Sequence, residues 1–124
     1  MLKKVLIILT IMISILNCKN AIINKNVNKI IIEDRTHEYV GKELDKVEIT
    51  DNTEINRLIN KINEYEEYIA KFEGKYYIII EYENNERLRL RTNGINFEII
   101  SELKYKNMRY FKIKNIINLL DYFN

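Results

Sequence analysis

The segment that decides the fold is KYYIIIEYENNERLRLRTNGINFEI, residues 75–99. Its first part, residues 75–83, is rich in β-branched and aromatic residues, which favour extended strands. The pair at 84–85, Asn-Asn, predicts a turn, and residues 86–92 then alternate strictly between polar and apolar side chains. The pair at 93–94, Asn-Gly, predicts a hairpin turn that leads into a further alternating strand. We therefore expect three antiparallel strands joined by turns.

Three arginines, Arg87, Arg89 and Arg91, stand two residues apart on the second of these strands. Side chains at that spacing point to one face of a strand, opposite Leu88 and Leu90. Because arginine presents a planar fork to phosphate and carboxylate groups, the stripe is a candidate site for an anion or an acidic partner. The alternative is structural: the arginines form a ladder of ion pairs with the preceding strand.

The register of the hairpin decides between these interpretations. A loop of residues 84–86 separates charged and apolar side chains onto different faces, whereas a two-residue loop mixes them, so we expect the longer loop. Its cross-strand ion pairs are Glu83 with Arg87 and Glu81 with Arg89. Arg91 then lies opposite Ile79 and is the arginine with most freedom to bind a partner.

One amphipathic helix is predicted over residues 52–67. Asp51 precedes Glu54 by three residues, an arrangement close to a capping box. The helix has a single apolar stripe, which consists of Ile55, Leu58, Ile59 and Ile62. Three acids lie near its end and lack the glycine turn and the spacing of a calcium loop, so they are read as solvated: Glu64, Glu66 and Glu67.

The remaining elements complete an α+β fold. Residues 30–32 and 46–50 are strand candidates, a polar loop is expected over 101–107, and a last strand over 108–113. A short terminal helix, capped by Asn115, is predicted from the spacing of Ile113, Ile116, Ile117 and Leu120. The expected order is β-β-α-β-β-β-β-α, with a small antiparallel sheet packed by two helices.

The amino terminus predicts export. Lys3 and Lys4 precede the apolar run 5–15, which is too short to cross a bilayer and has the length of a signal-peptide core. The only cysteine, Cys18, follows directly after this leader. We therefore divide the chain into a signal peptide at 1–17, a lipidated tether at 18–28 and one α+β domain at 29–124.

The residues Ile15-Leu16-Asn17-Cys18 resemble the lipobox of small bacterial lipoprotein precursors. The resemblance implies that Cys18 is acylated, as by palmitate, and becomes the first residue of the mature chain. The family prefers leucine three residues before the cysteine and a small residue directly before it, and the sequence departs from both preferences. The implied location is the cell envelope, outside the cytoplasm, with the membrane contacted through the lipid.

The segment from Val47 to Phe123 also resembles uncharacterised small lipoproteins of bacteria with low genomic GC content. In those proteins a strand, a helix and a hairpin series precede a short leucine-rich helix. The resemblance rests on this pattern of elements, without diagnostic residues, and implies no activity.

Composition excludes several classes of function. One cysteine and one histidine in 124 residues rule out disulfide frameworks, multi-thiolate zinc sites and two-histidine metal motifs. A net charge of +2 is too small to indicate nucleic-acid binding. His37 is interpreted as a solvated loop residue. We therefore predict no catalytic residue, no metal and no cofactor.

The expected function is a membrane-anchored envelope protein that binds another macromolecule or an anionic ligand without catalysis. Residues 38–86 carry 13 acidic and 6 basic side chains. One alternative is therefore an inhibitor or immunity protein whose acidic region, 51–73, covers a secreted enzyme. A second alternative is a small envelope hydrolase, which requires a cleft that gathers several carboxylates or places His37 beside a nucleophile.

Overall fold

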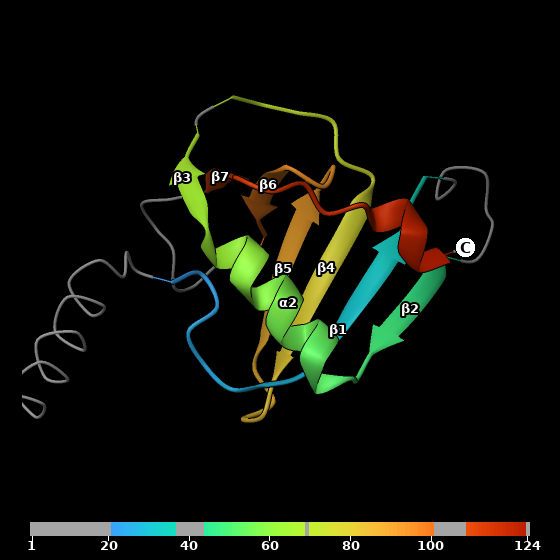
Figure 1. Cartoon of the computed structure of the whole chain (residues 1–124). Helices are drawn as coiled ribbons and strands as arrows, with labels where there is room; N and C mark the ends of the chain where they lie inside the picture. The colour runs from blue at the N-terminus through green and yellow to red at the C-terminus, as the bar shows by residue number, and fades with distance from the viewer. Residues whose placement is uncertain (1–20, 37–43, 69, 101–108, 124) are drawn as a thin grey trace, which may run out of the picture.

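The computed structural model describes residues 21–36, 44–68, 70–100 and 109–123. Within these ranges one antiparallel sheet has the strand order β2-β1-β4-β5-β6-β7-β3 (Figure 1). Its strands are β1 (Val27–Asp34), β2 (Asp45–Ile49), β3 (Tyr65–Glu67), β4 (Tyr76–Tyr82), β5 (Arg87–Thr92), β6 (Asn96–Ile99) and β7 (Tyr110–Ile113). The helices are α2 (Asn52–Asn63) and the 3-10 helix η2 (Leu119–Phe123). The α+β class and the antiparallel sheet are confirmed, whereas the predicted order with two α-helices is wrong.

The three strands predicted from residues 75–99 are β4, β5 and β6. Asn93 stabilises the second turn, because its side-chain Oδ1 accepts hydrogen bonds from the backbone N–H groups of Ile95 and Asn96 at 3.1 and 2.8 Å. Gly94 adopts a φ of 102°, which glycine reaches without a Cβ penalty. A Cβ at this position would also lie 2.5 Å from the carbonyl oxygen of Ile117.

Helix α2 begins where the sequence predicts and ends earlier. The side chain of Asp51 accepts a hydrogen bond from the backbone N–H of Glu54 at 3.0 Å, which caps the first turn. Ile55, Leu58 and Ile62 are buried against the sheet. The helix ends at Asn63, because the next residues are held as strand β3.

Strand β3 is absent from the predicted order. Its residues pair with β7, with Tyr65 opposite Ile113 and Glu67 opposite Phe111. These interstrand bonds replace the helical bonds expected up to residue 67. Glu66 and Glu67 therefore lie on an edge strand rather than at the end of a helix.

The predicted terminal α-helix is also wrong. Three backbone hydrogen bonds to other elements hold residues 113–117: Ile113 N to Ile95 O, Lys114 N to Glu64 O and Ile117 N to Gly94 O, at 2.9, 3.1 and 2.9 Å. Donors committed to distant carbonyls are not available for helical bonds within the segment. Of the four spaced apolar residues, Ile113 and Ile117 are buried and Ile116 and Leu120 are exposed, so the four do not share a face.

The folded domain begins before residue 29, where the sequence placed its boundary. Ile22 and Ile23 are 1% and 4% exposed and belong to the core. The backbone N–H of Ile23 donates to Asn63 Oδ1 at 2.9 Å, and Asn63 Nδ2 donates to the carbonyl of Ile23 at 3.0 Å. Two isoleucines gain free energy by leaving water. The described part of the predicted tether is therefore folded beside the end of α2.

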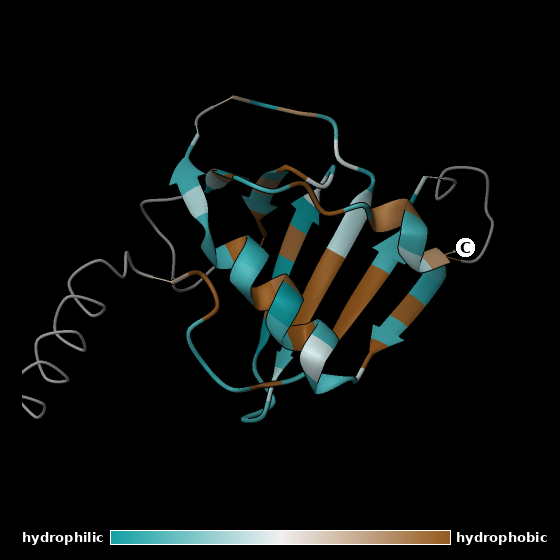
Figure 2. Cartoon of the chain, viewed as in Figure 1, coloured by the Kyte–Doolittle hydropathy of each residue, from teal (hydrophilic) through white to brown (hydrophobic). Residues whose placement is uncertain are grey.

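The core lies between the sheet and a layer of three segments. Residues 21–26, helix α2 and residues 114–123 all cross the same face of the sheet (Figure 1), which we call the inner face. Apolar residues dominate the central strands, and α2 turns polar residues outward (Figure 2). Phe97 and Phe111 stack at 4.9 Å between ring centroids at one end of this core. The opposite, outer face of the sheet carries the charged side chains.

Candidate functional site

The arginine stripe lies on the outer face of β5, as the alternation predicts. The hairpin register differs from both predicted loops: Glu81 pairs with Arg87, Ile79 with Arg89 and Tyr77 with Arg91. The predicted pairs Glu83–Arg87 and Glu81–Arg89 are wrong. Tyr82 N donates to Glu86 O at 2.9 Å, so the loop consists of residues 83–85. Asn85 adopts a φ of 69° there, which asparagine tolerates better than most residues.

The charged and the apolar side chains still lie on opposite faces of the hairpin, although its register differs from the predicted one. The observed register is displaced by two residues from the expected one, and an even displacement keeps each side chain on its face. Leu88 and Leu90 are buried in the core opposite Ile80 and Ile78. A cross-strand ion pair joins Arg87 Nη2 to Glu81 Oε2 at 3.2 Å.

Arg91 is the most enclosed of the three arginines rather than the one with most freedom. Its side chain is 22% exposed, against 57% for Arg87. Its Nε donates to Glu98 Oε1 at 3.0 Å, and its guanidinium lies 4.6 Å from the centroid of the Phe72 ring. The other carboxylate oxygen of Glu98 accepts from Arg109 Nε at 2.9 Å. Arg91 therefore has an acid and an aromatic ring as partners.

Arg91 belongs to a row of side chains that crosses six strands of the outer face. Following the register from β2 to β7, the row consists of Lys46, Glu33, Tyr77, Arg91, Glu98 and Tyr110. We call it the outer-face row. Glu33 is 3% exposed and forms ion pairs with Arg35 at 3.2 Å and with Lys46 at 3.8 Å. The Arg35 guanidinium lies 3.8 Å from the centroid of the Tyr77 ring.

The electrostatics of the row keep Glu98 ionised. Burial alone raises the pKa of this carboxyl, but hydrogen bonds from Arg91 and Tyr110 and the charges of Arg91 and Arg109 outweigh burial, so the pKa is lowered. Arg35 and Arg91 each lie over an aromatic ring and form an ion pair with a buried glutamate.

Basic side chains outnumber acidic ones on the described part of the outer face. The basic ones are Lys29, Arg35, Lys46, Arg87, Arg89, Arg91, Arg109 and Lys112. The acidic ones are Glu33, Glu48, Glu66, Glu81 and Glu98. The face therefore has an excess of positive charge, which favours an acidic partner.

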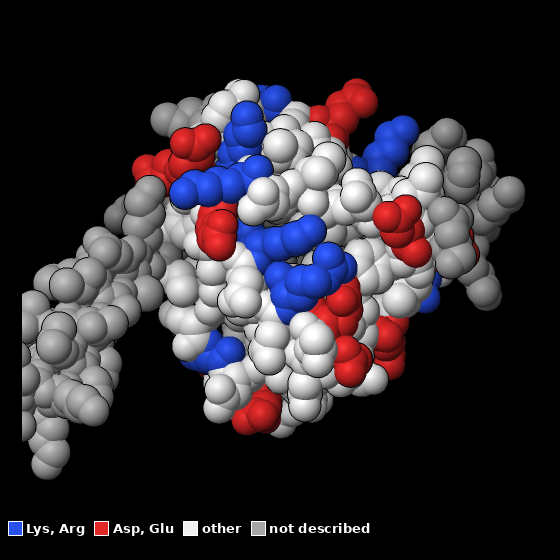
Figure 3. All heavy atoms as spheres, in the orientation of Figure 1, with Lys and Arg blue, Asp and Glu red and all other residues white. Residues whose placement is uncertain are grey.

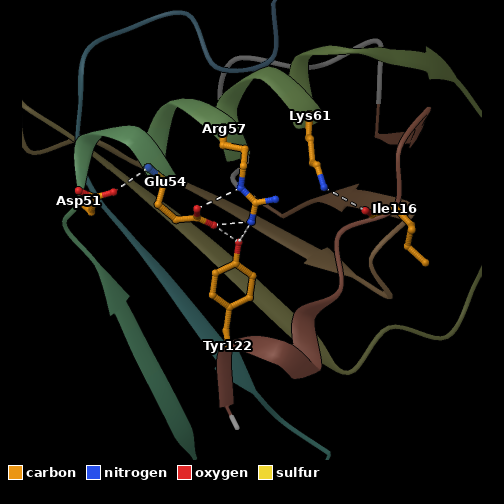
Figure 4. Close-up of polar contacts among 6 residues, drawn as sticks. All are labelled: Asp51, Glu54, Arg57, Lys61, Ile116 and Tyr122. Carbon is orange, nitrogen blue, oxygen red and sulfur yellow. Dashed lines mark hydrogen bonds and ion pairs between the residues drawn. The ribbon is translucent and has the colours of Figure 1, made fainter.

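A second polar cluster joins α2 to η2 on the opposite side of the sheet (Figure 4). Arg57 donates to both carboxylate oxygens of Glu54, at 3.0 Å from Nε and 2.6 Å from Nη2, and its Nη2 donates to the hydroxyl of Tyr122 at 3.1 Å. The Tyr122 hydroxyl in turn donates to Glu54. The hydrogen bonds from Arg57 and Tyr122 lower the pKa of Glu54. Burial and the bond to Glu54 raise the pKa of Tyr122 to about 12.

A shallow hollow adjoins this cluster. Its volume is about 170 Å³, and its walls consist of Arg57, Lys61, Ile117, Asn118, Asp121 and Tyr122. The ammonium group of Lys61 also donates to the carbonyl of Ile116 at 3.3 Å (Figure 4). The hollow is smaller than sites that enclose drug-sized ligands, which measure about 300–1,000 Å³.

Acidic side chains do not form a contiguous patch over α2. Figure 3 shows basic side chains gathered in the middle of this face, with acidic ones scattered around them. Glu54 is bound by Arg57, and Glu66 lies opposite Lys112 in the pairing of β3 with β7. The acidic surface required by the inhibitor alternative is therefore not present over this helix.

Several predicted features lie outside the described residues: Cys18, the leader at 1–17, His37 and the loop at 101–107. Across the described ranges, no group of three or more His, Cys, Asp or Glu side chains is arranged to hold a metal ion. In the same ranges no helix is long and apolar enough to span a membrane.

The residues that the sequence did not single out are Glu33, Arg35, Phe72 and Glu98. Their one sequence signal is alternation within strands, which places Glu33 and Glu98 on a polar face but does not identify their partners. Strands β1 and β4 are far apart in the sequence, so their pairing cannot be read from local spacing.

The comparisons with known proteins add no family to this description. No protein-family model matches the chain, and no curated protein and no solved structure is significantly similar to it.

Proposed function

We propose that the chain is a lipid-anchored protein of the cell envelope, held at the membrane through Cys18, that binds an envelope protein with an acidic surface. In this proposal the domain is a binding module without catalytic activity. The leader, the cysteine behind it and the resemblance to the lipobox support the anchor.

The observation that carries the binding proposal is the outer-face row together with two side chains that stack on it, Arg35 and Phe72. Arginine and aromatic residues are enriched at protein interfaces, and here they are stacked in pairs: Arg35 on Tyr77 and Arg91 on Phe72. Side chains already held in place lose little conformational entropy when a partner binds. The excess of positive charge on this face supports a partner of opposite charge.

Charge reversal on the outer face tests the binding proposal. The full chain and its Arg87→Glu/Arg89→Glu variant are each used to capture proteins from a detergent extract of the cell envelope. A matched variant, Lys61→Glu, reverses a charge on the inner-face layer. We expect a partner that is captured by the wild type and by Lys61→Glu, lost with the double variant, and released by added salt.

Two results contradict the binding proposal. One is a wild-type chain that captures no specific partner. The other is capture that persists unchanged in the double variant while circular dichroism shows that it is folded.

The anchor is tested separately by replacing the thiol. Cys18→Ser is expected to abolish labelling by a palmitate analogue and to release the chain from the membrane fraction. Labelling that persists in this variant contradicts acylation of Cys18.

The two alternatives are not carried forward. The described residues over α2 lack the contiguous acidic surface on which the inhibitor alternative depends. No observation among the described residues favours the hydrolase alternative, since Glu33, Glu54 and Glu98 are each bound by arginine.

A further inference from the structure

We propose that the inner-face layer, formed by residues 21–26, α2 and residues 114–123, is a membrane-docking face that rests on an anionic phospholipid surface. This inference rests on the proposed acylation of Cys18. It adds an orientation: the layer faces the bilayer, and the outer-face row points away from it toward the partner.

The chain between the proposed lipid on Cys18 and the core is short, which limits the distance between the domain and the bilayer. Three residues lie between Cys18 and Ile22, and a fully extended chain spans at most about 14 Å over these four residue steps. Ile22 is 1% exposed, so it cannot leave the domain while the core is intact. Asn63 holds the neighbouring residue, Ile23, by two hydrogen bonds at 2.9 and 3.0 Å. An acyl chain on Cys18 therefore brings the end of α2 close to the bilayer.

Two exposed aliphatic side chains on the same layer are available to enter the bilayer interface. Ile116 is 52% exposed and Leu120 is 58% exposed, and both belong to residues 114–123. Their neighbours Ile117 and Leu119 are each 3% exposed, so the segment already contributes to the core. The domain leaves about half of each of these two side chains uncovered. Aliphatic side chains in this position gain free energy by entering the interfacial layer of a bilayer.

Basic groups beside these side chains favour a bilayer with anionic headgroups. Lys61 donates to the carbonyl of Ile116 at 3.3 Å, so its ammonium group lies next to that residue. Lys114, which is exposed, stands two residues before Ile116. Arg57 is paired with Glu54, and Lys61 and Lys114 outnumber Asp121, the acid that follows Leu120. Lysines near an anionic leaflet strengthen membrane binding.

The test uses a chain that begins at residue 18 and carries Cys18→Ser, so that neither a leader nor a lipid contributes. This chain keeps every residue that the structure describes, including Ile22 and Ile23 of the core. It is mixed with vesicles of equal parts phosphatidylcholine and phosphatidylglycerol, and the fraction that floats with them is measured. We expect binding to these vesicles and little binding to vesicles of pure phosphatidylcholine.

Three variants locate the docking face. Ile116→Asn/Leu120→Asn is expected to lower the partition coefficient about ten-fold, because the apolar pair no longer enters the bilayer. Lys61→Gln is expected to lower it about five-fold. Lys29→Gln, which removes a lysine from the outer face outside the outer-face row, is expected to bind as the wild type does.

A fluorescent reporter at the same surface provides a second test of membrane contact if the double variant does not fold. The chain contains no tryptophan, so Leu120→Trp introduces a single reporter at an exposed position. Its emission is expected to shift to shorter wavelength when anionic vesicles are added.

The docking face is contradicted if the folded chain does not float with anionic vesicles, if Lys61→Gln and Lys29→Gln bind equally, or if the reporter does not shift. Because this chain carries no lipid, these results are independent of the palmitate experiment, which tests acylation alone.

Discussion

Arg91 on β5 and Glu98 on β6 lie directly opposite each other on the outer face, joined by a hydrogen-bonded ion pair of 3.0 Å between Nε and Oε1. The pair is largely enclosed, since the two side chains are 22% and 11% exposed. Arg91→Ala leaves Glu98 enclosed with one cationic partner fewer. We expect this variant to lower the free energy of unfolding by about 2 kcal/mol, measured by urea denaturation.

Arg87→Ala is the matched control for that measurement. Its ion pair with Glu81 lies on the same strand and face, but the arginine side chain is 57% exposed. An exposed pair contributes at most about 1 kcal/mol. Equal losses in the two variants would contradict the structural role assigned to Arg91.

The lowered pKa of Glu98 predicts how the free energy of unfolding changes with pH in the acid range. A carboxyl whose pKa is lower in the folded chain stabilises it fully above the usual value of 4.5, and this contribution is lost as the pH falls through the lowered folded value. Glu98→Gln is therefore expected to flatten the decline in stability between neutral and acid pH. Urea denaturation at a series of pH values measures the two slopes, and identical slopes would refute the prediction.

Tyr122 predicts the opposite dependence at alkaline pH. Its pKa of about 12 exceeds the usual value of 10.0, so the protonated hydroxyl stabilises the fold fully below pH 10. That contribution is lost as the pH rises through about 12. Tyr122→Phe is expected to remove the most alkaline step from the tyrosinate absorbance titration of the folded chain. An unchanged titration curve would show that another tyrosine accounts for that step.

Gly94→Ala is expected to destabilise the domain by about 2 kcal/mol or more, because the new Cβ meets both a positive φ and the Ile117 carbonyl. Asn85→Ala puts alanine, which tolerates positive φ less well than asparagine, at a φ of 69° and is expected to cost about 1 kcal/mol. Thermal unfolding compares the two. A smaller loss at residue 94 than at residue 85 would argue against the contact with Ile117.

Ile22→Ala tests whether the segment before β1 belongs to the core. Removing most of a side chain that is 1% exposed is expected to cost about 2–4 kcal/mol. Asn24→Ala, two residues away and exposed, is expected to change stability by less than about 0.5 kcal/mol. If both variants unfold like the wild type, the segment is a tether, as the sequence suggested.

The outer-face row shows which features local sequence patterns can predict and which they cannot. Strict alternation in residues 86–92 was sufficient to place the three arginines on one face, because the direction of a strand side chain depends only on parity. It was not sufficient to assign partners. The register depends on the turn that residues 83–85 adopt, and the contact between Glu33 and Tyr77 depends on the pairing of β1 with β4.

The sequence by itself determined the features that arise within a few residues: the strand periods, the Asn-Gly turn, the Asp51 cap and the buried stripe of α2. The tertiary structure decided where elements end and which polar groups meet. Strand β7 draws residues 65–67 into the sheet, the carbonyls of Ile95 and Gly94 hold residues 113–117 in place of a helix, and Asn63 binds the segment that leads to β1. Each of these outcomes depends on a hydrogen-bond partner distant in the sequence, and local spacing carries no information about such partners.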